Sequence, residues 1–76
     1  MAITEYLADA LARDVIEAME ALGDERLPDE VAAVIAATSP TTEEAFRTAV
    51  RVRIAERRAR KFLEQKLADA AAALEK

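Results

Sequence analysis

The sequence lacks cysteine and histidine, and it has one glycine and two prolines in 76 residues. Without cysteine, neither a disulfide nor a thiolate metal site can hold the fold together. Without histidine, the commonest general base and the commonest transition-metal ligand are both missing. The sequence also shows no nucleophile–base pair, phosphate-binding glycine loop or nucleotide motif. We therefore expect a non-enzymatic protein with no cofactor and no metal.

Long apolar runs are lacking too. No stretch approaches the ~18 apolar residues needed to span a bilayer. The N-terminal segment carries acidic residues early, which does not fit the basic start of a signal peptide. We therefore expect a cytoplasmic protein with no membrane partner. Binding of a basic helix to a membrane surface is an alternative, although tryptophan anchors are missing.

What the sequence does contain favours helix. Alanine supplies 19 of the 40 apolar residues, and it is the best helix former although it adds little to a core. The few helix-breaking residues divide a single all-α domain, residues 1–76, into three predicted helices at about 3–22, 28–37 and 42–74. The breaks are Gly23, Pro28 and the pair Ser39-Pro40. For the start of the third helix, a cap by Thr41 with Glu44 and a cap by Ser39 before Pro40 fit equally well.

The first predicted helix carries an apolar stripe, which we expect to pack against the rest of the domain. Its members recur at helical spacing: Ile3, Leu7, Leu11, Val15, Ala18 and Leu22. Asp14 lies at the edge of this stripe and predicts a structural ion pair with Arg53 or Arg57, because a buried carboxylate needs a partner. A catalytic acid is the alternative interpretation of Asp14. Ile16 falls outside the stripe, on an acidic face, and predicts either a partner contact or an exposed side chain.

The third predicted helix carries a longer stripe than its neighbours can cover. We call Ala45, Ala49, Val52, Ala59, Leu63, Leu67, Ala70 and Leu74 the long stripe. A second row, formed by Phe46, Val50 and Ile54, occupies another side of the first half only. The first helix is only about 30 Å long at 1.5 Å per residue, against roughly 50 Å for the third.

An uncovered apolar row predicts association with another copy of the chain. We expect a helical-bundle homodimer or higher oligomer, with a dimer favoured. The predicted self-association residues are Val52, Ala59, Phe62, Leu63, Leu67, Ala70 and Leu74. The alternative is a monomeric three-helix bundle with a frayed C-terminal end.

Charge is unevenly distributed along the chain. Residues 1–44 hold eleven acidic residues and two arginines, a net charge of −9, whereas residues 45–76 hold nine basic and four acidic residues, a net charge of +5. Seven of the basic residues lie between Arg47 and Lys61. We interpret them mainly as a face that balances the acidic first helix. The alternative is a nucleic-acid-associated protein, with phosphate contacts from Arg47, Arg51, Arg58 and Lys61.

Four further acidic residues lie near the start of the second predicted helix: Asp24, Glu25, Asp29 and Glu30. They lack the spacing and glycine of a calcium-binding loop, so we interpret them as helix-end acids. The sequence identifies no biological role. It predicts a small self-associating helical protein that serves as a protein–protein interaction module, with an unidentified protein as a further partner.

Overall fold

The computed structural model describes residues 2–75, which form three helices: α1 (Ile3–Leu22), α2 (Leu27–Ala36) and α3 (Pro40–Leu74). Residues 2–75 contain no strand. The predicted all-α class and the long third helix are therefore confirmed. The second and third helices begin one and two residues earlier than predicted.

The helix ends are set by the residues that the sequence singled out. Gly23 ends α1 in the left-handed conformation, with φ at +66°, which glycine adopts without strain. Ser39 caps α3, because its extended backbone lets Oγ accept a hydrogen bond from the Thr42 N–H at 3.2 Å. Pro40 then occupies the first turn, where its missing N–H costs nothing. Of the two caps considered, Ser39 with Pro40 is the one that forms.

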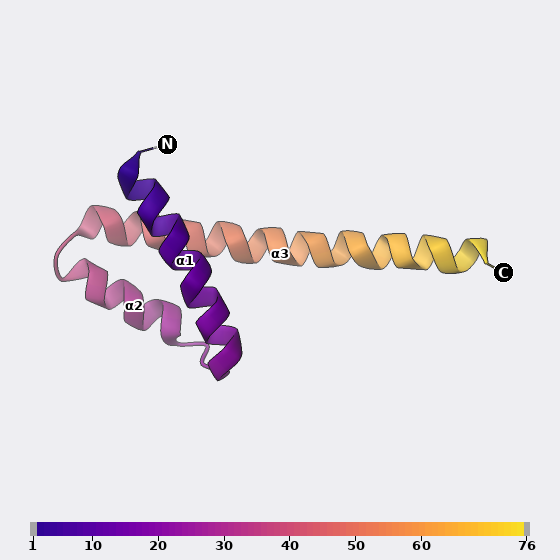
Figure 1. Cartoon of the computed structure of the whole chain (residues 1–76), viewed down its shortest axis with the longest axis horizontal. Helices are drawn as coiled ribbons and strands as arrows, with labels where there is room; N and C mark the ends of the chain where they lie inside the picture. Colours follow the sequence, from indigo (N-terminus) through magenta and orange to yellow (C-terminus); the bar gives the residue numbers. More distant parts are fainter. Residues whose placement is uncertain (1, 76) are drawn as a thin grey trace.

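The core lies where α1 crosses the first half of α3 and α2 packs beside both (Figure 1). Phe46 from α3 and Ile16 from α1 are its largest fully buried side chains. Around them lie the smaller buried residues Ala8, Ala12, Val15, Ala32 and Val50. Because most of these are alanine or valine, the helices approach closely around a thin core.

The side of α1 that faces the core overlaps the predicted stripe only in part. Ile3, Leu7, Leu11 and Leu22 are 38–71% exposed, whereas Ile16 is 1% exposed. The physical reason is the close crossing of α1 and α3. Ala8 and Ala12 turn toward the core and leave space for Phe46, and Ile16 lies on their side of the helix. Val15 belongs to the predicted stripe and is only 6% exposed, so the stripe is right at that position and wrong at its leucines and Ile3.

The molecule is long and thin, with principal extents of 59 × 30 × 13 Å. The long dimension is that of α3, whose second half projects beyond α1 and α2 (Figure 1). From Ala55 to Glu75 every residue of the chain is exposed. The fold therefore consists of a small three-helix core at one end and a single solvent-exposed helix at the other.

Candidate self-association surface

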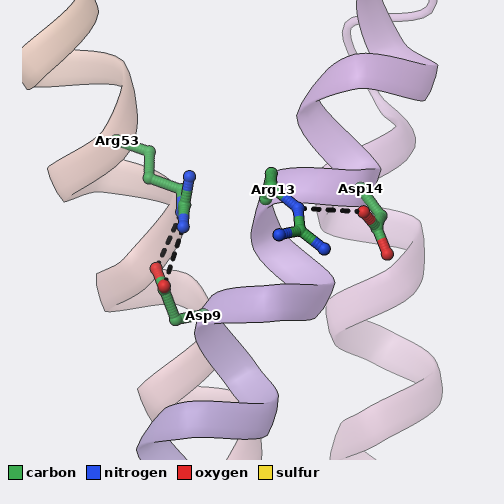
Figure 2. Close-up of polar contacts among 4 residues, drawn as sticks. All are labelled: Asp9, Arg13, Asp14 and Arg53. Atoms are coloured by element: carbon green, nitrogen blue, oxygen red, sulfur yellow. Dashed lines mark hydrogen bonds and ion pairs between the residues drawn. The ribbon is translucent and has the colours of Figure 1, made fainter.

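Two arginines of α3 hold α1 in place. Nε and Nη2 of Arg53 donate hydrogen bonds to the two carboxylate oxygens of Asp9, both at 2.7 Å (Figure 2). The hydrogen bonds from Arg53 lower the pKa of the Asp9 carboxyl group, and the same contact raises the pKa of Arg53. One turn further along α3, Arg57 donates to Glu20. These arginines therefore balance acidic residues of the first helix, as expected for part of the basic segment.

The predicted ion pair of Asp14 with Arg53 or Arg57 does not form. Asp14 instead accepts a hydrogen bond from Nε of its neighbour Arg13 at 3.2 Å, and its side chain is 62% exposed. Figure 2 shows Asp14 on the side of α1 that points away from Arg53. The reason is that α1 packs against α3 through the side that carries Ala8 and Ala12. Asp14 belongs to the Leu7–Leu11 side of the helix, and that side does not face α3.

All seven predicted self-association residues are exposed in the single chain. The large ones are 52–88% exposed: Val52, Phe62, Leu63, Leu67 and Leu74. Ala59 and Ala70 lie between them on the long stripe. At 100° per residue, this stripe is displaced roughly 140° around α3 from the row of Phe46, Val50 and Ile54 that packs into the core. The row of Phe46, Val50 and Ile54 packs into the core, where Ala45 and Ala49 at the start of the long stripe also contact it, and the stripe from Val52 onward is exposed to solvent.

The long stripe is already exposed at Val52, and it continues beyond the last ion pair that joins α3 to α1. Arg57 makes the last hydrogen bond from α3 to α1 among the described residues. Beyond it, Leu63, Leu67 and Leu74 continue the stripe along the projecting half of α3 (Figure 1), with Phe62 at its flank. Ala70 separates Leu67 from Leu74 on the same side, so a second helix has room to approach closely there.

Only some of the basic residues of α3 form ion pairs with acidic residues of the chain. Arg47 donates to Asp29 at 2.9 Å and to Glu43 at 3.1 Å, and both hydrogen bonds raise its pKa. The other three residues predicted to contact phosphate are Arg51, Arg58 and Lys61. They are exposed, and none forms an ion pair within residues 2–75. One of the four predicted phosphate contacts is therefore already used inside the chain.

An open groove of about 640 Å³ lies in the angle between the C-terminal half of α1 and the middle of α3. Its apolar floor comes from Ile16, Met19 and Ile54, and charged side chains such as Arg57 and Glu64 form its rim. No charged group is buried among the residues the structure describes. The groove is therefore an open depression of the surface with a charged rim.

Within residues 2–75, no group of three or more acidic residues is placed to hold a metal ion. None of the described helices is both long and apolar enough to cross a bilayer. Comparisons with protein-family models, with curated proteins and with solved structures found no match. The exposed long stripe of α3 is therefore the main feature from which a role can be inferred.

Proposed function

We propose that this chain is a non-enzymatic helical module that assembles with copies of itself through the long stripe of α3. One observation carries the proposal. Phe62, Leu63, Leu67 and Leu74 lie 52–88% exposed on a helix that continues beyond the reach of α1 and α2. Soluble monomers rarely keep a contiguous apolar surface of this kind.

The pattern of residues along α3 favours assembly over a frayed end. In a helix end that is unfolded in solution, large apolar residues repeated on one side would add no stability. Here they recur over more than three turns, up to Leu74. An isolated helical segment of this length is marginal in water. Burial against a partner would give the segment the tertiary packing that stabilises most helices, and a second copy is the simplest partner.

The proposal is tested by measuring molar mass in solution. Size-exclusion chromatography with light scattering should give at least twice the mass of the chain at micromolar concentration. The double variant Leu63→Glu/Leu67→Glu should be monomeric, because it places two charges in the middle of the long stripe. The matched control is Gln65→Glu/Ala68→Glu, which adds the same charge on the opposite side of α3 and should leave the assembly intact.

Two outcomes would contradict the proposal. A wild-type chain that is monomeric up to about 1 mM would show that association is weaker than roughly 4 kcal/mol, too weak to serve as an assembly module. If the Leu63/Leu67 variant and its control behave alike, the association uses another surface. In that case the exposed side of α1, with Leu7 and Leu11, would be the next surface to test.

The exposed bases Arg51, Arg58 and Lys61 support a second candidate function, association with nucleic acid. They lie on the side of α3 away from the long stripe, so an assembled form would still present them. Phosphate contacts are strongest at low salt and weaken steeply as salt is added. A titration with duplex DNA and with RNA at about 50 mM salt should show binding that Arg58→Ala/Lys61→Ala reduces. Lack of binding at that salt concentration rules this function out.

A further inference from the structure

The exposed large apolar residues of the chain gather on two helices. Among the described residues, α1 carries five of them and α3 carries another five, while Val34 of α2 stands apart. On α1, four of these residues lie on one side, within an arc of about 100° at 100° per residue. We call them the outer face of α1: Ile3, Leu7, Leu11 and Leu22, which are 38–71% exposed. The chain therefore leaves two separate apolar surfaces uncovered.

Pairing of the long stripe with a second long stripe would leave the outer face of α1 exposed. Soluble proteins rarely keep contiguous apolar surface uncovered. A contact between the stripe of one copy and the outer face of another covers both kinds of surface at once. Their lengths are similar, since α1 extends about 30 Å and the part of the stripe from Ala59 to Leu74 extends about 22 Å.

The projecting half of α3 cannot cover the outer face of its own chain. Residues 41–74 contain no glycine and no proline, so the helix has none of the residues at which a sharp kink would form. Figure 1 shows this half leading straight away from α1. The outer face is also turned away from α3, as the position of Asp14 shows (Figure 2). A second chain must therefore supply the cover.

We infer that the projecting half of α3, through Leu63, Leu67 and Leu74, docks on the outer face of α1 of a second copy. This inference rests on the proposed function and names the surface that receives the long stripe. The contact joins two different patches, so it is heterologous. Each chain has one patch that docks and another that receives.

The charges beside the two surfaces are complementary. Asp14 lies within the outer face with its side chain 62% exposed, and Glu17 is exposed at the edge of that face. On α3, Lys66 lies beside Leu63 and forms no ion pair within residues 2–75. Opposite charges therefore meet when the stripe docks on α1, whereas like charges meet when either surface pairs with itself.

The net charges of the two segments agree with this choice of partner. Helix α1 carries five acidic residues and one arginine, a net charge of −4. Residues 58–74 carry four basic and two acidic residues, a net charge of +2. Self-pairing of the projecting halves would bring two positive segments together, which disfavours that contact. Docking on α1 brings segments of opposite sign together.

Mixing two complementary variants tests the inference. Leu7→Glu/Leu11→Glu charges the outer face and keeps the stripe, whereas Leu63→Glu/Leu67→Glu charges the stripe and keeps the outer face. Each variant alone should be monomeric by light scattering, because it lacks one of the two surfaces. An equimolar mixture should give twice the mass of the chain, because the intact stripe of one variant meets the intact outer face of the other.

Two controls separate loss of the surface from loss of the fold. Leu7→Met/Leu11→Met keeps the outer face apolar and should assemble like the wild type. Circular dichroism checks that each variant keeps its helices. If Leu7→Glu/Leu11→Glu loses them, Ile3→Glu/Leu7→Glu takes its place in the mixture, because Ile3 and Leu7 are 69% and 56% exposed.

Each outcome either supports the docking surface or overturns it. Assembly that appears only in the mixture supports it. If Leu7→Glu/Leu11→Glu keeps the mass of the wild type while Leu63→Glu/Leu67→Glu is monomeric, the inference fails and the proposed self-association stands. A mixture that stays monomeric up to about 1 mM also overturns the inference. A monomeric wild-type chain overturns both proposals.

A second measurement locates the receiving surface directly. Because the chain has no cysteine, Ala68→Cys takes a single nitroxide label on the side of α3 away from the stripe. Labelled chains are mixed with ¹⁵N-enriched wild type, and the amide signals of the enriched copy are recorded. Residues 3–22 should broaden more than residues 63–74. The reverse order would show that the stripe docks on another stripe and would overturn the inference.

Discussion

Asp9 of α1 and Arg53 of α3 meet in an ion pair with two hydrogen bonds of 2.7 Å, although 44 residues separate them in the sequence. Arg53 lies about two fifths of the way along α3. On one side of it, Phe46 and Val50 are buried by α1 and α2. On the other side, the helix soon runs beyond the cover of its own chain. The contact therefore fixes how much of the long stripe is left for another molecule.

The first prediction concerns this pair. Asp9→Asn removes the carboxylate that accepts both hydrogen bonds, so it should lower the melting temperature modestly, as expected for a largely exposed ion pair. The effect should shrink in high salt, which screens exposed charges. Thermal unfolding followed by circular dichroism at one fixed protein concentration measures both. The matched control is Asp14→Asn, because the hydrogen bond that Asp14 accepts comes from its sequence neighbour Arg13 and its loss should change little. A larger effect at Asp14 would contradict the structure.

The second prediction is the pH dependence of the same contact. Arg53 lowers the pKa of the Asp9 carboxyl in the folded chain below its ordinary value of 3.8. The folded state therefore binds a proton at Asp9 less readily than the unfolded state does. The stabilisation is fully present above the unfolded pKa and is lost as the pH falls through the folded pKa. Wild type and Asp9→Asn should differ in melting temperature at pH 7 and converge once the pH has fallen below the folded pKa of Asp9. A difference that persists unchanged into strong acid would contradict this assignment.

The third prediction tests which side of α1 faces the core. Ile16→Ala should destabilise the fold by about 2–5 kcal/mol, because it removes a fully buried side chain and leaves a cavity. In so small a domain that loss approaches the total stability. The control is Leu7→Ala on the same helix, where the leucine is 56% exposed and the cost in the monomer should stay within about 0.5 kcal/mol. Urea unfolding at low protein concentration, where assembly is weak, separates the two. Equal costs would restore the stripe predicted from spacing.

The fourth prediction distinguishes the two caps considered for α3. Ser39→Ala removes the hydroxyl oxygen that accepts from the Thr42 N–H and should cost about 1 kcal/mol. Thr41→Ala should change stability by no more than about 0.5 kcal/mol, because Thr41 lies within the first turn and caps nothing. The same urea titration gives both values. The reverse ranking would show that the capping box beginning at Thr41 forms in solution.

The helices could be predicted from the sequence because their limits depend on local chemistry. Gly23, Pro28 and the Ser39-Pro40 pair each restrict the backbone through their own conformational preferences, whatever the rest of the chain does. The exposure of Phe62 and Leu67 was also predictable, since it follows from comparing helix lengths. These features need only residue types and the rise of a helix.

The packing side of α1 and the ion-pair partners could not be predicted in the same way. Hydrophobic spacing favours the side with the largest residues, which contains Leu7 and Leu11. The crossing with α3 instead buries the side with Ala8 and Ala12, whose small side chains allow the two helices to approach closely around Phe46. The rotation inferred from spacing turns Asp14 toward Arg53 and puts the true partner, Asp9, on the outer face. The sequence did offer one indication of the true packing side, namely the two acidic residues Asp9 and Glu20, one at each end of the part of α1 that crosses α3.

The fifth prediction follows the projecting half of α3 by amide hydrogen exchange. Residues 62–73 are all exposed in the single chain, so no burial holds their helix closed and their protection should depend on assembly. At high protein concentration they should exchange slowly, and on dilution into the monomer range their exchange should speed up while residues 46–54 stay protected. Leu63→Glu/Leu67→Glu should show fast exchange in this segment at every concentration, whereas Gln65→Glu/Ala68→Glu should follow the wild type. Slow exchange of residues 62–73 in a verified monomer would show that α3 needs no partner to stay folded, and the physical reason for self-association would then be lost.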